Sequence, residues 1–127
     1  MMSAQPGRVL VLELNEITWD LMDPLMDRGL LPNFRRLLEE GVRGEPHALE
    51  VAPDLDPWVT WTTLYTGVPQ ETHGLKMLEQ DKDGIGARWI WDYLKDAGLR
   101  LGIYGSANTW PPLEVNGFWV PGPFSRD

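Results

Sequence analysis

Five residues of this chain have side chains that could hold a metal ion or lie beside a phosphate group. They fall at three places along the sequence: Asn15 and Glu16, Asp54 and Asp56, and His73. Carboxylate and amide oxygens suit a hard or borderline cation, and a helix N-terminus suits a phosphate. From the residues alone the signal is weak, because the sequence has no Gly-rich phosphate loop, nucleophile elbow or His-Glu-x-x-His pair.

The first pair follows a run that is typical of a buried strand. Residues 8–14 read Arg-Val-Leu-Val-Leu-Glu-Leu, a short and nearly continuous apolar run. Asn15 and Glu16 then lie at the carboxyl end of a strand, where parallel sheets bind ligands. The plain alternative is that they only form the turn from the strand into the next helix, and both interpretations stay open.

The elements that must position these residues follow from hydrophobic spacing. Apolar side chains recur at helical spacing in four segments: residues 18–29, 32–41, 57–67 and 89–98. Each segment ends at a glycine, which favours helix termination, although Pro24 weakens or splits the first. Short strands are expected at residues 99–104 and 118–120. This order predicts an α/β fold with a mainly parallel sheet and helices on both faces.

The second place in the sequence lies at a helix start. Asp56 before Pro57 is a favourable N-cap followed by a favourable first helical residue. Capping and site membership do not exclude each other, because a capping carboxylate lies at the helix N-terminus. Thr60 carries the nearest hydroxyl, and its plain interpretation is a residue on the helix face. His73 is expected to stabilise a turn before Gly74.

Composition limits the classes of protein that fit. The chain has 127 residues, a net charge of −8 and no cysteine. Length predicts one domain or a piece of one, and the acidic balance argues against a nucleic acid or an anionic membrane as partner. Disulfides and thiolate-metal sites are excluded. No apolar run reaches the roughly 18 residues of a membrane helix, so we expect a cytoplasmic protein with a disordered tail at residues 1–7.

Several segments, in order, resemble the type I phosphodiesterase/nucleotide pyrophosphatase family of the alkaline phosphatase superfamily. They are residues 9–21, 29–41, 61–67, 73–74, 90–98 and 109–118. The most recognisable is Trp-Thr-Thr-Leu-Tyr-Thr-Gly at residues 61–67, followed by His73 and Gly74. The resemblance implies an alkaline-phosphatase-like fold, of which residues 8–127 would be an incomplete N-terminal portion.

The resemblance also implies a chemistry. Enzymes of this family hydrolyse phosphoric esters with two divalent metal ions, often zinc, which clamp the attacking and leaving oxygens. One family ligand, an Asp at the end of the first strand, corresponds to Asn15, which offers a carbonyl oxygen without charge. The nucleophilic Thr or Ser corresponds to Pro57, or to Asp56 after a one-residue slip. A phosphate-contacting Asn corresponds to Leu78.

Two functional hypotheses follow. The first is a fragment of a metal-dependent hydrolase of phosphoric esters that is inactive alone. On this hypothesis Asn15 and Asp56 lie nearest the two metal ions with Glu16 behind them, and Asp56 and Thr60 are the candidate catalytic residues. The alternative is a non-catalytic binding or interaction protein on the same scaffold, because Asn15 and Pro57 remove a ligand charge and a nucleophile.

The expected partners differ between these hypotheses. The hydrolase would take a small phosphoric ester and would pair with the remaining part of its domain. A half-domain also exposes apolar surface, so we expect poor solubility or self-association. A third and weaker hypothesis is a free-standing small domain that dimerises through exposed tryptophans.

Overall fold

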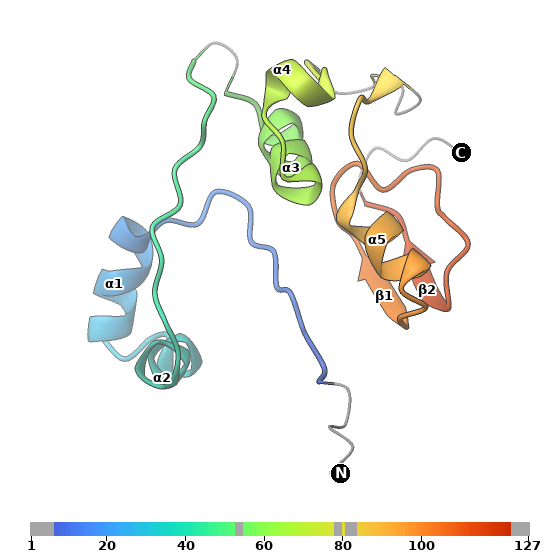
Figure 1. The fold of residues 1–127 in the computed structure, drawn as a ribbon. Coiled ribbons are helices and arrows are strands. Elements are labelled where there is room, and N and C mark those ends of the chain that lie inside the picture. Colours follow the sequence, from blue (N-terminus) through green and yellow to red (C-terminus); the bar gives the residue numbers. More distant parts are fainter. Residues whose placement is uncertain (1–6, 53–54, 78–79, 81–83, 123–127) are drawn as a thin grey trace. The chain divides into compact units, whose positions relative to one another are not determined.

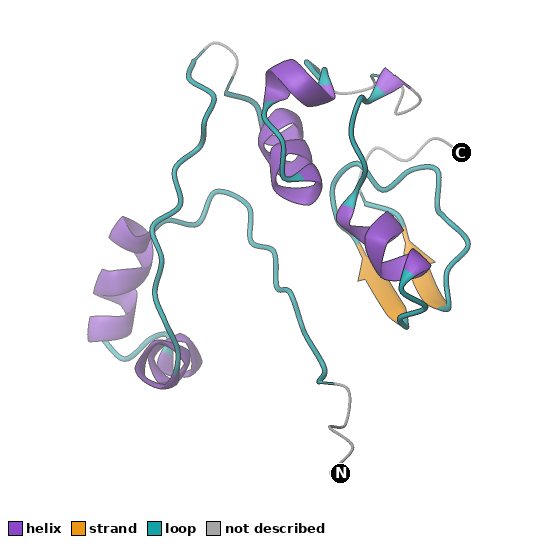
Figure 2. Cartoon of the chain, viewed as in Figure 1, coloured by secondary structure: helices purple, strands orange, loops and turns teal. Residues whose placement is uncertain are grey.

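The computed structural model describes residues 7–52, 55–77, 80 and 84–122. Contacts divide the chain into two compact units, residues 1–45 and residues 46–127. Figure 2 shows that helices are present in both units and that the strands lie in the second. Each unit is described separately below.

The first unit holds two helices, α1 (Trp19–Asp27) and α2 (Pro32–Glu40). Helix α1 begins after Thr18 and continues through Pro24 without splitting. Gly29 follows it with a φ of +71°, a conformation that favours glycine. The sequence therefore predicted both helices correctly, and Pro24, the sixth of the nine residues of α1, does not interrupt the helix.

Arg43 links the segment that follows α2 to helix α1. Its guanidinium donates to Asp23 of α1 at 2.9 Å and to Glu45 at 3.1 Å. The same group lies 4.3 Å from the centre of the Trp19 ring, and the Trp19 indole N–H donates to the carbonyl of Gly44 at 3.0 Å. These contacts hold the chain that leaves α2 against the first turns of α1.

The strand predicted at residues 8–14 is not formed. The two strands among the described residues pair with each other, and neither pairs with residues 8–14. A strand needs such a neighbour to satisfy its backbone N–H and C=O groups. Its apolar side chains are consequently exposed, with Val9 at 88% and Leu10 at 91%. The turn at Asn15 and Glu16 does form, and Glu16 has a φ of +57°.

The second unit contains a two-stranded parallel sheet. Strand β1 (Leu101–Tyr104) pairs with β2 (Gly117–Val120) in the register Leu101 to Gly117. Gly117 is required at this position, because a Cβ there would lie 1.8 Å from the Leu101 carbonyl oxygen. Helix α5 (Ile90–Asp96) packs on β1. Helices and a small parallel sheet are compatible with the predicted α/β fold.

An aromatic cluster forms the core of the second unit. The Trp91 ring stacks on Trp89 at a centroid distance of 4.9 Å and lies 5.0 Å from Tyr65. It also meets the edge of Trp119 at 5.5 Å. Aromatic pairs of this kind contribute about 0.5–1.5 kcal/mol each beyond area burial. Trp91 therefore joins three parts of the chain that are distant in sequence.

Two further helices, α3 and α4, precede α5 in the second unit. Helix α3 (Pro57–Thr66) ends at Gly67, which has a φ of +70°. The four-residue helix α4 (Gln70–His73) follows and packs against α3 (Figure 1). The sequence predicted α3 but not α4, because four residues are too few for a periodic pattern. No helix among the described residues is long and apolar enough to cross a membrane.

The exposed segment at residues 9–12 leads to a testable prediction. We expect the chain to self-associate through these apolar side chains. Sedimentation velocity should show oligomers that the double variant Leu10→Lys/Leu12→Lys shifts toward monomer. Glu39→Lys on exposed α2 adds the same charge elsewhere and should not shift them. A wild-type chain that sediments as a monomer at 100 μM, roughly, would contradict the prediction.

Candidate functional site

Asp56, a predicted site residue, is the N-cap of helix α3. The Oδ1 atom of Asp56 accepts the backbone N–H of Trp58 at 2.8 Å, and Pro57 occupies the first helical position. This geometry is that of an N-cap, so the capping interpretation is confirmed. Asp56 is half-buried. A cap of this kind also places a carboxylate at the helix N-terminus, where the helix dipole is positive.

Thr60 lies one turn into the same helix, but its hydroxyl is engaged locally. Its Oγ1 donates to the carbonyl of Asp56 at 3.0 Å. A hydroxyl that donates its hydrogen bond to a peptide carbonyl has no base at that position to activate it. The geometry is therefore that of a residue on the helix face, and a catalytic role for Thr60 stays a prediction.

Thr63 differs from the other threonines of α3. Thr60, Thr62 and Thr66 each donate to the carbonyl four residues earlier, at 2.7–3.0 Å. The Thr63 hydroxyl instead donates to the Oε1 atom of Glu50 at 2.9 Å. Its oxygen also lies 3.1 Å from Nε2 of His73. Thr63 is thus the residue of α3 that connects two ionisable groups.

The proton positions in this contact follow from the surroundings of His73. The backbone N–H of Leu75 donates to Nδ1 of His73 at 3.1 Å, so the ring proton lies on Nε2 and points at Thr63. His73, Thr63 and Glu50 therefore form a hydrogen-bonded chain with one direction, from imidazole to hydroxyl to carboxylate. His73 also stabilises the turn at Gly74, as the sequence predicted.

Burial controls the protonation state of His73. Its side chain is fully buried, and desolvation lowers its pKa below the ordinary value of 6.5, although the charges of Glu50 and Glu71 act in the opposite direction. Glu50 is 9% exposed, and its Oε2 atom has no hydrogen-bond partner among the described residues. A neutral imidazole and a carboxylate with one unpaired oxygen thus share one buried network.

Asn108, in the loop after β1, makes a second set of contacts to α3. Asn108 adopts a left-handed conformation with a φ of +55°. Its Nδ2 donates to Oγ1 of Thr62 at 2.8 Å and to the carbonyl of Trp58 at 3.1 Å. The loop after β1 is therefore tied to α3 across about 50 residues of sequence.

Sequence reasoning missed Glu50, Thr63 and Asn108 as interacting residues. Glu50 is one of 19 acidic residues, and nothing in its neighbours marks it as buried. Thr63 stands in the family-like segment, but its hydroxyl resembles those beside it. The only available signal was Asn108, since Asn is among the residues that adopt a left-handed conformation.

The remaining predicted residues do not complete a metal centre. Asn15 and Glu16 belong to the first unit, which the structure describes separately from Asp56. Asp54 and Leu78 lie outside the described residues. Within the described part of the chain no group of three His, Cys, Asp or Glu side chains could hold a metal ion. Both His73 nitrogens are already hydrogen-bonded. Within the second unit, the described residues therefore do not by themselves supply the ligands of a two-metal site.

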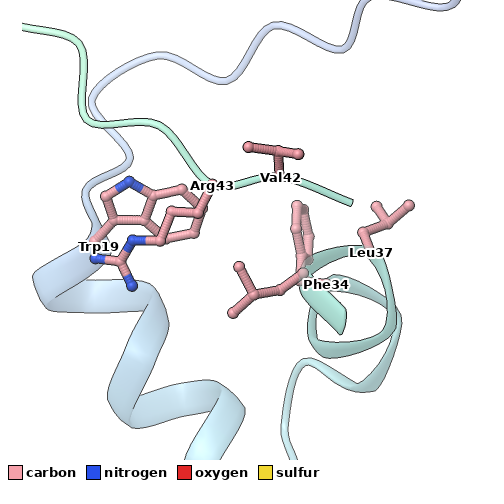
Figure 3. A pocket seen from close by; sticks show the side chains of 6 residues that line it. Trp19, Phe34, Leu37, Val42 and Arg43 are labelled. Atoms are coloured by element: carbon pink, nitrogen blue, oxygen red, sulfur yellow. The ribbon is translucent and has the colours of Figure 1, made fainter. Parts of the chain in front are cut away.

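A small pocket in the first unit is unrelated to these residues. It is lined by Trp19, Phe34, Leu37, Leu38, Val42 and Arg43 (Figure 3). Its one charged group, Arg43, is paired with Asp23 and Glu45. The pocket holds no predicted catalytic or metal-binding residue.

The geometry defines a mixed helical and parallel-strand domain whose helix α3 carries an acidic cap and a buried polar network. Comparison with known protein families identifies the family to which this chain belongs. The model of the type I phosphodiesterase/nucleotide pyrophosphatase family matches residues 9–118, so the chain belongs to this family. No curated protein matches the chain, and no solved structure does.

The capping contact at Asp56 can be tested by stability. Asp56→Ala should lower the free energy of unfolding by about 0.5–2 kcal/mol, because it leaves the Trp58 N–H without a partner. Asp56→Asn keeps the acceptor oxygen and should change stability by only a few tenths of a kcal/mol, roughly. Urea denaturation followed by tryptophan fluorescence measures both. An equal loss in the two variants would contradict the capping role.

The buried chain of hydrogen bonds gives a second stability prediction. Thr63→Val should destabilise the protein by about 1–3 kcal/mol, because it leaves the His73 N–H and Glu50 unsatisfied. Thr60→Val makes the same chemical change on the same helix but removes only a bond to the preceding turn, so we expect a change within about 0.5 kcal/mol. Similar urea midpoints for the two variants would contradict the network.

Proposed function

We propose that this chain is the N-terminal part of a hydrolase of phosphoric esters with an alkaline-phosphatase-like fold. The family match over residues 9–118 supports this proposal. It covers both units and includes helix α3 with its acidic N-terminus. In this proposal the N-terminus of α3 faces the substrate, and Asp56 is the residue of the described chain nearest the reacting phosphate.

The described residues alone do not supply the chemistry. A lone carboxylate at Asp56 repels a phosphate group, and Pro57 offers neither a hydroxyl nor a backbone N–H. Zinc sites in enzymes take three or more protein ligands, whereas Asn15 and Asp56 would supply one oxygen-bearing side chain each. We therefore propose that further ligands come from polypeptide outside these residues and that the chain alone does not turn over esters.

A specific observation favours the second candidate function, a non-catalytic binding protein. The Thr60 hydroxyl donates its hydrogen bond to the Asp56 carbonyl. Asn15 carries no charge, and Pro57 stands where the resemblance places the nucleophile. If these features persist in the complete polypeptide, the scaffold would bind a phosphoric ester without cleaving it.

An activity assay separates the two candidates. The longest natural polypeptide containing residues 9–118 is assayed against bis(p-nitrophenyl) phosphate with added zinc. We expect turnover, and a loss on the order of 100-fold or more in Asp56→Asn, which keeps the cap but removes the charge. Thr66→Val, at the opposite end of α3, removes a hydroxyl that donates to the carbonyl of Thr62 in the same helix and serves as the control.

Two other outcomes change the conclusion. Full activity in Asp56→Asn would restrict Asp56 to capping. No turnover by the wild-type polypeptide, together with binding of inorganic phosphate by calorimetry, would favour the binding protein over the hydrolase.

A further inference from the structure

His73 holds three segments of the second unit together. Its side chain contacts Thr63 of α3 through Nε2 and the Leu75 backbone through Nδ1. Its carbonyl accepts the N–H of Gly86 at 3.3 Å. Leu75, directly after the turn, is 2% exposed. His73 therefore contributes three hydrogen bonds around the turn at Gly74, and Gln70 and Gln80 add side-chain bonds to the carbonyls of Leu75 and Gly74.

Protonation of His73 is incompatible with this arrangement. The second ring proton would have to bind at Nδ1, where the Leu75 N–H already points from 3.1 Å. Two N–H donors cannot face each other at that distance without one turning away. A cationic imidazole in this fully buried position would also lose its hydration.

We propose that His73 is a pH-sensitive switch that holds the turn at Gly74 and helix α4 against α3 when neutral and releases them when protonated. The released segment comprises α4, the turn and the contact to Gly86. The aromatic cluster around Trp91 and the β1–β2 pairing contain no histidine, so they stay folded. The switch acts independently of whether the chain belongs to a hydrolase or a binding protein.

The direction of the pH effect follows from the charges around the imidazole. The charged groups that act on His73 are Glu50, through Thr63, and Glu71 of α4, and both favour the cation. Desolvation outweighs them and lowers the pKa of His73. The folded state therefore binds fewer protons than the open state, and the closed form loses stability as pH falls below the ordinary histidine pKa of about 6.5.

NMR on the whole chain tests the switch, because it has only two histidines. His47 is exposed, and its imidazole signals serve as an internal reference for those of the buried His73. Long-range ¹H–¹⁵N spectra should show His73 with its proton on Nε2 at neutral pH. As pH falls below about 6.5, the ordinary pKa of the open-state imidazole, amide protection of Leu75 and Gly86, corrected for intrinsic exchange, should fall by up to about tenfold per pH unit until the lowered pKa of closed His73 is reached.

Amides in the sheet distinguish a switch from general acid unfolding. The N–H groups of Leu101 and Gly105 donate to Asn116 and Val120 and should stay protected through the His73 transition. Loss of protection at Leu101 together with Leu75 would overturn the proposal, as would a His73 proton on Nδ1 at neutral pH.

Two variants assign the effect to the proposed residues. His73→Gln should abolish the pH dependence of Leu75 protection, and a retained transition would contradict the proposal. Glu50→Gln keeps the acceptor for Thr63 but removes the negative charge that favours a cationic His73. By lowering the pKa of His73 in the closed form further, it should enlarge the total fall in Leu75 protection on acidification, and an equal or smaller fall would contradict the network. His47→Gln should leave the transition in place.

Discussion

The packing of the turn after α4 against α3 depends on one fully buried imidazole, His73, keeping both of its nitrogens hydrogen-bonded. His73 meets this requirement with a backbone N–H on one side and the Thr63 hydroxyl on the other. Unpaired, either nitrogen would cost on the order of 1–3 kcal/mol. That cost fixes the turn after α4, the rotamer of Thr63 and the side-chain position of Glu50. The Oε2 atom of Glu50, which has no hydrogen-bond partner among the described residues, is the one unfavourable feature of this network.

Helix α3 is held on several sides by contacts of different kinds. Val59 is fully buried, and Tyr65 enters the aromatic cluster. Asn108 satisfies polar atoms on a further side, and Thr63 faces His73. A helix fixed in this way presents its N-terminus in a defined orientation. That property suits an element whose first turn is proposed to face a substrate.

The family relationship and the local chemistry point in different directions at a few positions. The match over residues 9–118 is long enough to establish the family. Asn15 and Pro57, however, stand where the resemblance expects a charged ligand and a nucleophile. Function resides in sites rather than in folds, so membership of the family supports a hydrolase-like scaffold more strongly than it supports catalysis by these residues. The Asp56 carboxylate is compatible with a scaffold role and with a role in catalysis, since its capping contact uses one of its two oxygens.

The sequence by itself determined what depends on neighbours within a few residues. Asp56 and Pro57 specified the start of α3, and Gly67 specified its end, because capping and left-handed termination are local effects. Strand pairing is not local. Residues 8–14 have the composition of a buried strand, yet only an adjacent strand could make them one.

The tertiary structure alone decided which polar residues act together. Glu50, Thr63 and His73 are 13 and 10 residues apart in the pairs that they form, and Asn108 lies 46 residues from Thr62. No periodicity marks such pairs in the sequence. They arise because burial leaves each polar group dependent on whichever partner the packed chain brings within hydrogen-bond distance.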